Sequence, residues 1–235
     1  MRRRFVNGLG FLLTQLLILN MKWYDAYLIL LLVSKPIDLL LTLSFFHCQI
    51  LWDNRFRGDT GEDCLVSVDG VDFEIEEPWP YRKNYSKRWF SNKFKGPGVR
   101  YMICISLKKG DIVRIAGPVA CGKMNDGMMF ESYLIDELGP YERVEADAGY
   151  QSFDPEFAKT PANANLRPEE HAKLSNTVRA RQETVNKRFK QWGCLRQVYR
   201  HKLERHSELL RAVAVITQFA INNGEKLFEV EYIVT

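Results

Sequence analysis

Two short apolar runs in this chain each lead into an aspartate, and they constrain the fold more than any other feature. Residues 64–68 form the first run, which ends at Asp69 and Gly70. Residues 144–146 form the second, and Asp147 follows directly. Apolar runs of this length are typical of buried strands, and we expect each aspartate to emerge where its strand ends at the sheet edge. If the two strands are neighbours, both carboxylates lie on one rim of the sheet.

The elements between these two runs predict a mixture of strands and helices. Residues 99–107 and 112–116 are rich in β-branched and apolar side chains, and the glycine-containing loop between them predicts an antiparallel hairpin. Asn125 and Asp126 then provide a helix cap, and the helix is expected to end at Gly139.

The rest of the chain predicts a loop followed by two helices. Residues 152–168 contain three prolines and indicate a connecting loop. Helical spacing resumes at about residues 168–192 and again at 202–223. The strand at residues 64–68 can continue through residues 71–75. The predicted order along the chain is then this strand, a hairpin, a helix, a second strand and a long helix. This order predicts an α/β domain with a sheet flanked by helices.

The first fifty residues differ in character from the rest. Arg2, Arg3 and Arg4 precede an uncharged run at residues 5–21, and leucine-rich runs follow. The uncharged run falls just short of the roughly 18 apolar residues expected of a spanning helix. Residues 1–50 are therefore interpreted as a hydrophobic helical extension, a signal or membrane anchor, or a segment foreign to the ancestral protein. Residues 51–235 are taken as one catalytic domain.

Net charge and cysteine content indicate which partners and which stabilising features to expect. The net charge of +4 comes from 33 basic and 29 acidic residues, so it says little about partners. Five cysteines form no Cys-x-x-Cys pair, which argues against both a disulfide framework and a structural zinc site. A reducing, intracellular setting fits this pattern best.

Acids that come together from different elements suggest metal-dependent phosphodiester chemistry. Two divalent ions about 4 Å apart can clamp the attacking and leaving oxygens of a phosphodiester, and such ions take carboxylate ligands. Besides Asp69 and Asp147, the long helix offers Glu183. Four apolar residues of this helix lie opposite Glu183, namely Val178, Val185, Phe189 and Trp192. Its own face is otherwise polar or cationic, with Asn176, Arg179, Lys187 and Lys190.

Four segments resemble the DDE endonuclease domain of Harbinger-like transposases. They are DCLVSVDGVDF at residues 63–73, NKFKGPGVRY at 92–101, EADAGY at 145–150 and RQETVNKRF at 181–189. The resemblance extends from about Leu51 to Tyr232, and together the four segments are far more specific than any one alone.

This resemblance implies an RNase H-like mixed sheet flanked by helices. It also implies that Asp69, Asp147 and Glu183 are the catalytic, metal-binding triad, with 35 residues between the last two. The implied cofactor is Mg²⁺ or Mn²⁺, the partner is double-stranded DNA, and the reaction is strand cleavage followed by strand transfer. A nuclear location and a separate DNA-binding partner protein are implied as well. Whether the chain forms a homo-oligomer is left open.

Cations interleaved with aromatic residues predict a DNA-binding surface. Residues 81–101 carry seven cations and no acid, and residues 178–205 carry nine cations and two glutamates. Contacts between such cations and phosphates make binding strongly dependent on salt. The predicted DNA-binding residues are Arg88, Lys93, Lys95, Arg100, Arg179, Lys187 and Lys190.

Other functions remain open at this point. Asp69 with Gly70 also fits turn chemistry, Asp147 can open a loop, and Glu183 can pair with Arg179 or Lys187. A transposase-derived module that binds DNA or protein without catalysis fits the same sequence, as does a protein attached to a membrane through residues 1–50.

Two further patterns are weaker. Residues 117–123 approach a P-loop but lack the Ser or Thr that binds Mg²⁺, since Met124 follows. His201 and His206 are five residues apart and point to different faces of a helix, which disfavours a zinc site.

Asp126 is interpreted as a helix cap, with an accessory acid as the alternative.

Overall fold

The computed structural model describes residues 50–56, 64–78, 87–160 and 169–222, together with residues 225 and 227. The predicted hydrophobic segment at residues 1–50 lies outside these ranges except for its last residue. Within the described ranges, no helix combines the length and the apolar character needed to cross a membrane.

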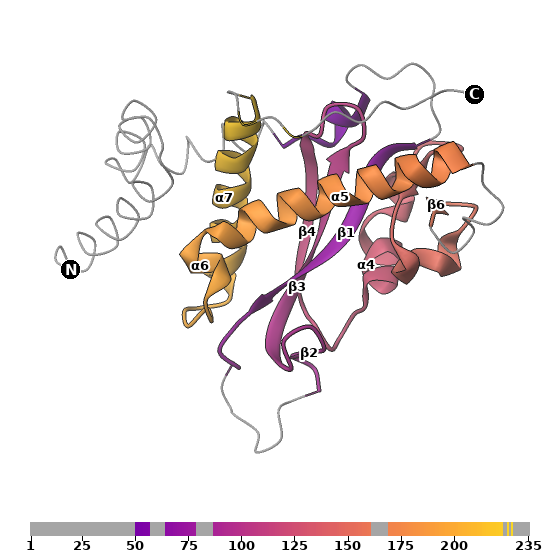
Figure 1. Cartoon of the computed structure of the whole chain (residues 1–235). Coiled ribbons are helices and arrows are strands. Elements are labelled where there is room, and N and C mark those ends of the chain that lie inside the picture. The colour runs from indigo at the N-terminus through magenta and orange to yellow at the C-terminus, as the bar shows by residue number, and fades with distance from the viewer. Residues whose placement is uncertain are drawn as a thin grey trace. The chain divides into compact units, whose positions relative to one another are not determined.

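Along the described residues, four strands come first after a short 3-10 helix, short helices and two short strands follow, and three α-helices come last (Figure 1). The strands are β1 (Cys64–Glu74), β2 (Phe90–Ser91), β3 (Gly96–Ser106), β4 (Ile112–Ala120), β5 (Arg143–Glu145) and β6 (Ala158–Lys159). The α-helices are α4 (Asp126–Tyr133), α5 (Glu169–Gln191), α6 (Gly193–Arg196) and α7 (Glu204–Asn222). The 3-10 helices are η1 (Trp52–Phe56), η2 (Ile135–Glu137) and η3 (Ala148–Phe153).

The six strands form one mixed sheet. Its order is β2-β3-β1-β5-β6, with β4 also paired to β3. Strands β1, β3 and β4 are antiparallel neighbours, which confirms the predicted hairpin, whereas β5 runs parallel to β1 and β6 runs parallel to β5. The predicted mixed sheet flanked by helices is therefore confirmed.

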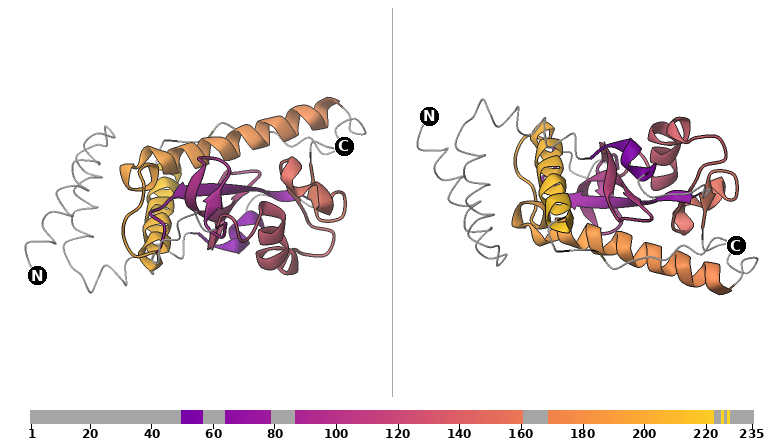
Figure 2. Two further views of the ribbon diagram at one scale, coloured as in Figure 1. Left: turned by 90° about the horizontal axis from the view of Figure 1, so that it is seen from below. Right: turned by 90° about the horizontal axis from the view of Figure 1, so that it is seen from above.

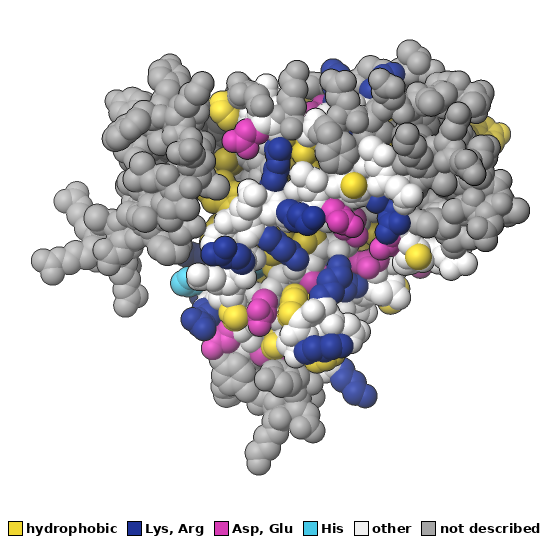
Figure 3. All heavy atoms as spheres, viewed as in Figure 1, with side chains coloured by type: hydrophobic (Ala, Val, Ile, Leu, Met, Phe, Trp, Pro, Cys, Tyr) yellow, Lys and Arg dark blue, Asp and Glu magenta, His cyan; other side chains and the backbone are white. Residues whose placement is uncertain are grey.

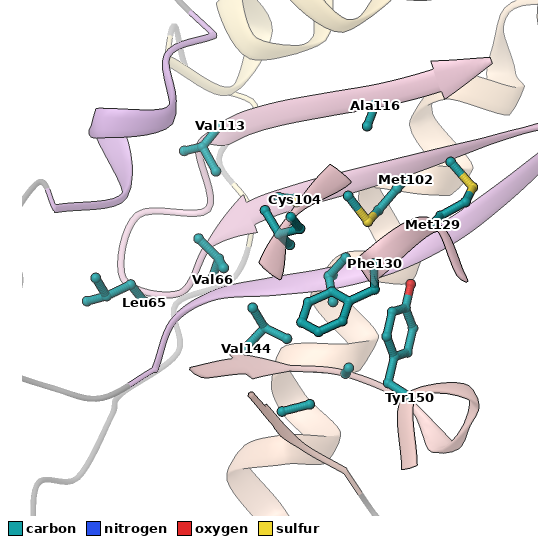
Figure 4. Close-up of a cluster of buried hydrophobic side chains, with 14 residues drawn as sticks. Leu65, Val66, Met102, Cys104, Val113, Ala116, Met129, Phe130, Val144 and Tyr150 are labelled. Carbon is teal, nitrogen blue, oxygen red and sulfur yellow. The ribbon is translucent and has the colours of Figure 1, made fainter. Parts of the chain in front are cut away.

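Helices α5 and α4 cover opposite faces of this sheet (Figure 2). Because β1 has a helix above and below it, nearly all of its residues are buried rather than alternately buried and exposed. On the α4 face, Val66 and Val68 pack with Met129, Phe130 and Tyr150 in an apolar cluster (Figure 4).

Helix α5 is fixed across the sheet by a buried glutamine. The Gln182 side chain accepts a hydrogen bond from Ser67 Oγ at 2.8 Å and donates one to the Ile103 carbonyl at 3.2 Å. Val178, Val185 and Phe189 of the same helix are fully buried, as the predicted helical face requires. These contacts determine which face of α5 is directed toward the rim of the sheet.

The start of the domain is held by a buried ion pair. Arg55 Nε lies 2.8 Å from Glu142 Oε1, and both side chains are only 6% exposed. The Arg55 guanidinium also stacks 4.1 Å from the Trp52 ring centroid. Residues 52–56 are therefore a folded part of the domain.

Strand β1 continues through Asp69 to Glu74, as the sequence of residues 71–75 allowed, because its other edge stays paired with β3 along this whole length. Two other local expectations were wrong. Helix α4 ends at Tyr133, and the short helix η2 replaces its expected last turn. The predicted loop at 152–168 contains β6, whose two residues extend the sheet beside β5.

Candidate active site

Asp69 and Asp147 come after the last residues that pair two neighbouring strands, β1 and β5. Strands β1 and β5 pair in parallel up to Ser67 opposite Glu145, and each aspartate comes two residues later. Strand β5 stops there while β1 continues, so the edge of β1 is open beside Asp69. The two strands are thus neighbours, as predicted, and they bring both aspartates to one rim. Asp69 lies within its strand, however, and does not end it.

Glu183 on α5 reaches the same region. Asp69, Asp147 and Glu183 all line one pocket between the sheet rim and α5; its full lining is Ser67, Val68, Asp69, Glu145, Asp147, Arg179, Gln182 and Glu183. The structure therefore brings the three predicted acids from three separate elements to one pocket.

The three carboxylates do not form a ready set of metal ligands. The Glu183 side chain is 62% exposed, and its Oε2 lies 3.9 Å from Lys187 Nζ. Among the residues that the structure describes, no group of three or more His, Cys, Asp or Glu side chains is close enough to hold a metal ion. Glu183 thus lies at the mouth of the pocket, and an ion that used all three acids would require its side chain to turn inward.

Asp69 is the most strongly perturbed acid of the pocket. Burial raises its pKa to about 6; the positive charge of Lys93 opposes this rise, and the negative charges of Asp147 and Asp126 add to it. Carboxylates close enough to repel one another favour binding of a cation between them. Asp69 therefore has the environment expected of a metal ligand.

Asn186 fixes the orientation of Asp69. Its Nδ2 donates a hydrogen bond to Asp69 Oδ2 at 2.6 Å, and the Gly70 amide donates to Oδ1 at 2.8 Å. Asn186 Oδ1 is buried without a hydrogen-bond partner. The sequence interpretation missed Asn186, although its position three residues after Glu183 puts it on the same helical face.

Asp126 was interpreted from the sequence as a helix cap, with an accessory acid as the alternative. Asn125 is the helix cap, because its side chain accepts a hydrogen bond from the Met128 amide at 2.8 Å. The Asp126 carboxylate instead packs against β1, where a Cβ built at Gly70 would lie only 1.8 Å from Asp126 Oδ1. Of the two readings of Asp126, the cap is therefore wrong.

Gly70 has a packing role rather than a turn role. It lies inside β1 and pairs with Met102 of β3, so the turn reading of Asp69 and Gly70 is wrong. A side chain at position 70 would occupy the space that Asp126 fills. Asp147 caps the 3-10 helix η3 rather than opening a loop, since its Oδ1 accepts a hydrogen bond from the Gly149 amide at 2.8 Å.

Cations surround the acids. Lys93 Nζ donates a hydrogen bond to the Gly70 carbonyl at 2.8 Å, and Lys190 Nζ lies 5.9 Å from the Phe73 ring centroid. Arg179 lines the pocket itself. Lysine and arginine side chains are spread over the face that α5 crosses (Figure 3). The surface-exposed residues among those predicted to bind DNA are Arg88, Lys93, Lys95, Lys187 and Lys190.

Arg100 was predicted to bind DNA, but its guanidinium is held inside the protein. Its Nε and Nη2 donate to the two oxygens of Asp72 at 2.7 and 3.0 Å, and the side chain is only 11% exposed. Although burial raises the pKa of Asp72, hydrogen bonds from Arg100 and Ser91 hold it below its ordinary value. Breaking such a buried pair to contact a phosphate is costly, so Arg100 is removed from the DNA-binding set.

The structure explains the P-loop-like segment at residues 117–123 and the histidine considered as a zinc ligand. Strand β4 continues to Ala120, which pairs with Val99, so residues 117–120 belong to the sheet and do not form a phosphate-binding loop. His206 is buried, and its Nδ1 lies 2.8 Å from the hydroxyl of Tyr101. It therefore has a structural role in the core.

Comparison with known proteins adds nothing to this geometry, since no protein-family model, curated protein or solved structure matched the chain. Function is therefore argued from the site. Its donors are carboxylate and amide oxygens, which are the ligands preferred by Mg²⁺ and Mn²⁺. Two of them, Asp126 Oδ1 and Asn186 Oδ1, are buried and lack a hydrogen-bond donor. This donor set fits a hard divalent cation.

Proposed function

We propose that residues 51–235 form an RNase H-like, metal-dependent DNA endonuclease or strand transferase of the DDE type, resembling Harbinger-like transposases. The single observation that carries the proposal is the parallel pairing of β1 and β5, which puts Asp69 and Asp147 two residues beyond one strand pair. The sheet order supports an RNase H-like core, because antiparallel β4, β3 and β1 are followed by parallel β5 and β6.

In this proposal, Asp69 and Asp147 share one divalent ion and Glu183 completes the site of a second. Mg²⁺ or Mn²⁺, when bound there, supplies activation of a water molecule and neutralisation of charge on the phosphate. Asn186 holds Asp69 in one orientation through the hydrogen bond to Oδ2. Arg179 lies at the pocket, where a cation attracts the phosphate of the DNA backbone.

The exposed cations extend this pocket into a DNA-binding face. Lys187 and Lys190 lie on the same helix as Glu183, so DNA bound along α5 passes over the pocket. Arg88, Lys93 and Lys95 contribute from the segment before β3. Double-stranded DNA is the proposed substrate, in the nucleus and with a separate DNA-binding protein as partner, as the resemblance implies.

The experiment that tests this function is cleavage of end-labelled duplex DNA by the full chain with Mg²⁺ or Mn²⁺. Asp69→Asn, Asp147→Asn and Glu183→Gln should each abolish the metal-dependent product. Glu131→Gln is the control, because Glu131 is an exposed acid on α4 that does not line the pocket. Retained cleavage in all three site variants would remove the assignment.

A second candidate function is DNA binding without catalysis, as in a transposase-derived module. The specific observation in its favour is Glu183, which faces solvent beside Lys187 rather than the two aspartates. Salt-dependent DNA binding with no nicking in either Mg²⁺ or Mn²⁺ would favour this function over the nuclease. Attachment to a membrane through residues 1–50 concerns a segment outside the described residues.

A further inference from the structure

Asp126 lies at the open edge of β1, on the opposite side of that strand from α5. It is the first residue of α4, and the absence of a side chain at Gly70 lets its carboxylate touch the strand. Phe130, one helical turn later, is fully buried in the apolar cluster of the α4 face. Because the helix is fixed in this way, the position of Asp126 follows from the packing of α4.

The carboxylates of Asp126 and Asp147 face the same small space beside Gly149. A Cβ built at Gly149 would lie 3.0 Å from Asp147 Oδ1 and 4.0 Å from Asp126 Oδ2. Asp69 precedes Gly70, against which the Asp126 carboxylate packs. Acids from β1, α4 and the segment after β5 therefore lie at one place on the sheet, although in the described structure these three side chains are not close enough to hold a metal ion.

The cations near Asp126 leave one of its oxygens without a hydrogen bond. Arg100 Nη1 lies 3.4 Å from Asp126 Oδ1, but the hydrogen bonds of this guanidinium go to Asp72 and to the Met124 carbonyl. Asp126 Oδ1 is buried and has no donor. A buried carboxylate oxygen that has a guanidinium at 3.4 Å but receives no hydrogen bond still has lone pairs available to a metal ion.

Tyr150 gives an independent indication that this space takes a ligand. Its side chain is fully buried beside Phe130 (Figure 4), and its hydroxyl has no hydrogen-bond partner. Burial raises the pKa of Tyr150 well above its ordinary value, and the charges of Asp126, Asp69 and Asp147 add to this effect. A buried, unpaired hydroxyl one residue after Gly149, near which the Asp126 and Asp147 carboxylates lie, is suited to donate to a carboxylate or water of a metal coordination shell.

We propose that Asp126 is a ligand of the same divalent ion that Asp69 and Asp147 bind, and that these three carboxylates, which are not close enough to hold an ion as they stand, move together when the ion binds. The proposal rests on the proposed function, because it deepens the metal site on which that function depends. The proposal also explains why residue 70 is a glycine, because the absence of a side chain there lets a ligand on α4 reach an ion at the rim of β1.

The test is direct Mn²⁺ binding to the full chain without DNA, measured by calorimetry and by the spin resonance signal of free Mn²⁺. We expect Asp126→Asn and Asp69→Asn each to weaken Mn²⁺ binding by at least about tenfold. The control Glu131→Gln, on the same helix, should bind Mn²⁺ as the wild type does. Unchanged thermal unfolding of Asp126→Asn without metal separates loss of a ligand from loss of the fold.

A second measurement uses the wild-type protein and so does not depend on the folding of a variant. Fe²⁺ bound in place of Mn²⁺, with ascorbate and peroxide, cuts the backbone close to its ligands. We expect cuts near Asp69, Asp126 and Asp147 that excess Mg²⁺ suppresses.

The outcomes distinguish the two proposals. Cuts near Asp69 and Asp147 but not Asp126, or wild-type Mn²⁺ affinity in Asp126→Asn, would overturn the role of Asp126 and leave the proposed function standing. Absence of Mn²⁺ binding and of cutting in the wild type would overturn both.

Discussion

The side-chain amide of Asn186 donates a hydrogen bond to Asp69 Oδ2 across 2.6 Å and connects residues 117 positions apart in the chain. Asp69 lies on the central strand and Asn186 on α5, so this hydrogen bond couples the position of the helix to the orientation of the carboxylate. Because α5 also carries Glu183, the same contact relates the positions of two of the three predicted catalytic acids.

Asn186→Ala should reduce DNA cleavage by about ten- to a hundredfold, because residues that orient a metal ligand typically contribute this much. The loss should appear in kcat rather than in DNA affinity, since the Asn186 amide is hydrogen-bonded to Asp69 and carries no charge to pair with a phosphate. Single-turnover cleavage and a binding titration on the same variant separate the two effects. An unchanged rate constant would show that the hydrogen bond has no positioning role.

Gly70→Ala should destabilise the protein by roughly 1–3 kcal/mol, because the new methyl group overlaps the Asp126 carboxylate. Truncating Asp126 to alanine should relieve this overlap. In urea unfolding, the double variant is therefore expected to lose less unfolding free energy than the sum of the losses in the two single variants. Simple additivity of the two changes would mean that the side chains do not meet.

The exposed cations should contribute separately to the salt dependence of DNA binding. Replacing Lys187 or Lys190 with alanine should lower the slope of log affinity against log salt by about 1 each, if each neutralises one phosphate. Lys108, an exposed lysine on the turn between β3 and β4, is the control. Arg100→Ala should reduce stability instead, and equal salt slopes for all these variants would argue against the DNA-binding face.

His206 should make the protein less stable in acid. Burial lowers its pKa to about 4 in the folded state, from an ordinary value of 6.5. Between these pH values the unfolded chain binds more protons than the folded protein. The stability that depends on a neutral His206 is therefore complete above about pH 6.5 and is lost as the pH falls toward 4. The loss amounts to roughly 3 kcal/mol at pH 4.

Urea unfolding between pH 7 and pH 4 measures this effect. His206→Gln should be less stable at neutral pH, because the contact with the Tyr101 hydroxyl changes, but its stability should depend less on pH in this range. The same pH dependence in the variant would mean that another group titrates.

Much of the fold could be predicted because its signals are local. Apolar runs, the loop before Ile112 and the spacing of Val178, Val185 and Phe189 each depend on neighbouring residues, and the structure confirms the strands, the hairpin and the helical face they predict. Strand β6 was missed because two residues carry no periodic pattern. Its pairing with β5 depends on a tertiary contact.

The site was predictable only in part, for the same physical reason. Asp69 and Asp147 stand out because each follows an apolar run. Asp126 and Asn186 do not, since a helix cap and a polar helical face look alike in sequence whether or not they meet a distant strand. The burial of Arg100 was equally hidden, because its partner Asp72 lies on another strand and the pairing depends on the register of β1 against β3.

Binding of a divalent ion by the acids at the rim of β1 and β5 can be seen in crystals of the protein grown with Mn²⁺, with and without a DNA end, through the anomalous scattering of the metal. We expect a peak within coordination distance of both the Asp69 and Asp147 carboxylates, and a second peak near Glu183 when DNA is bound. A map with no metal between Asp69 and Asp147, at Mn²⁺ concentrations that support cleavage, would contradict the proposed metal site.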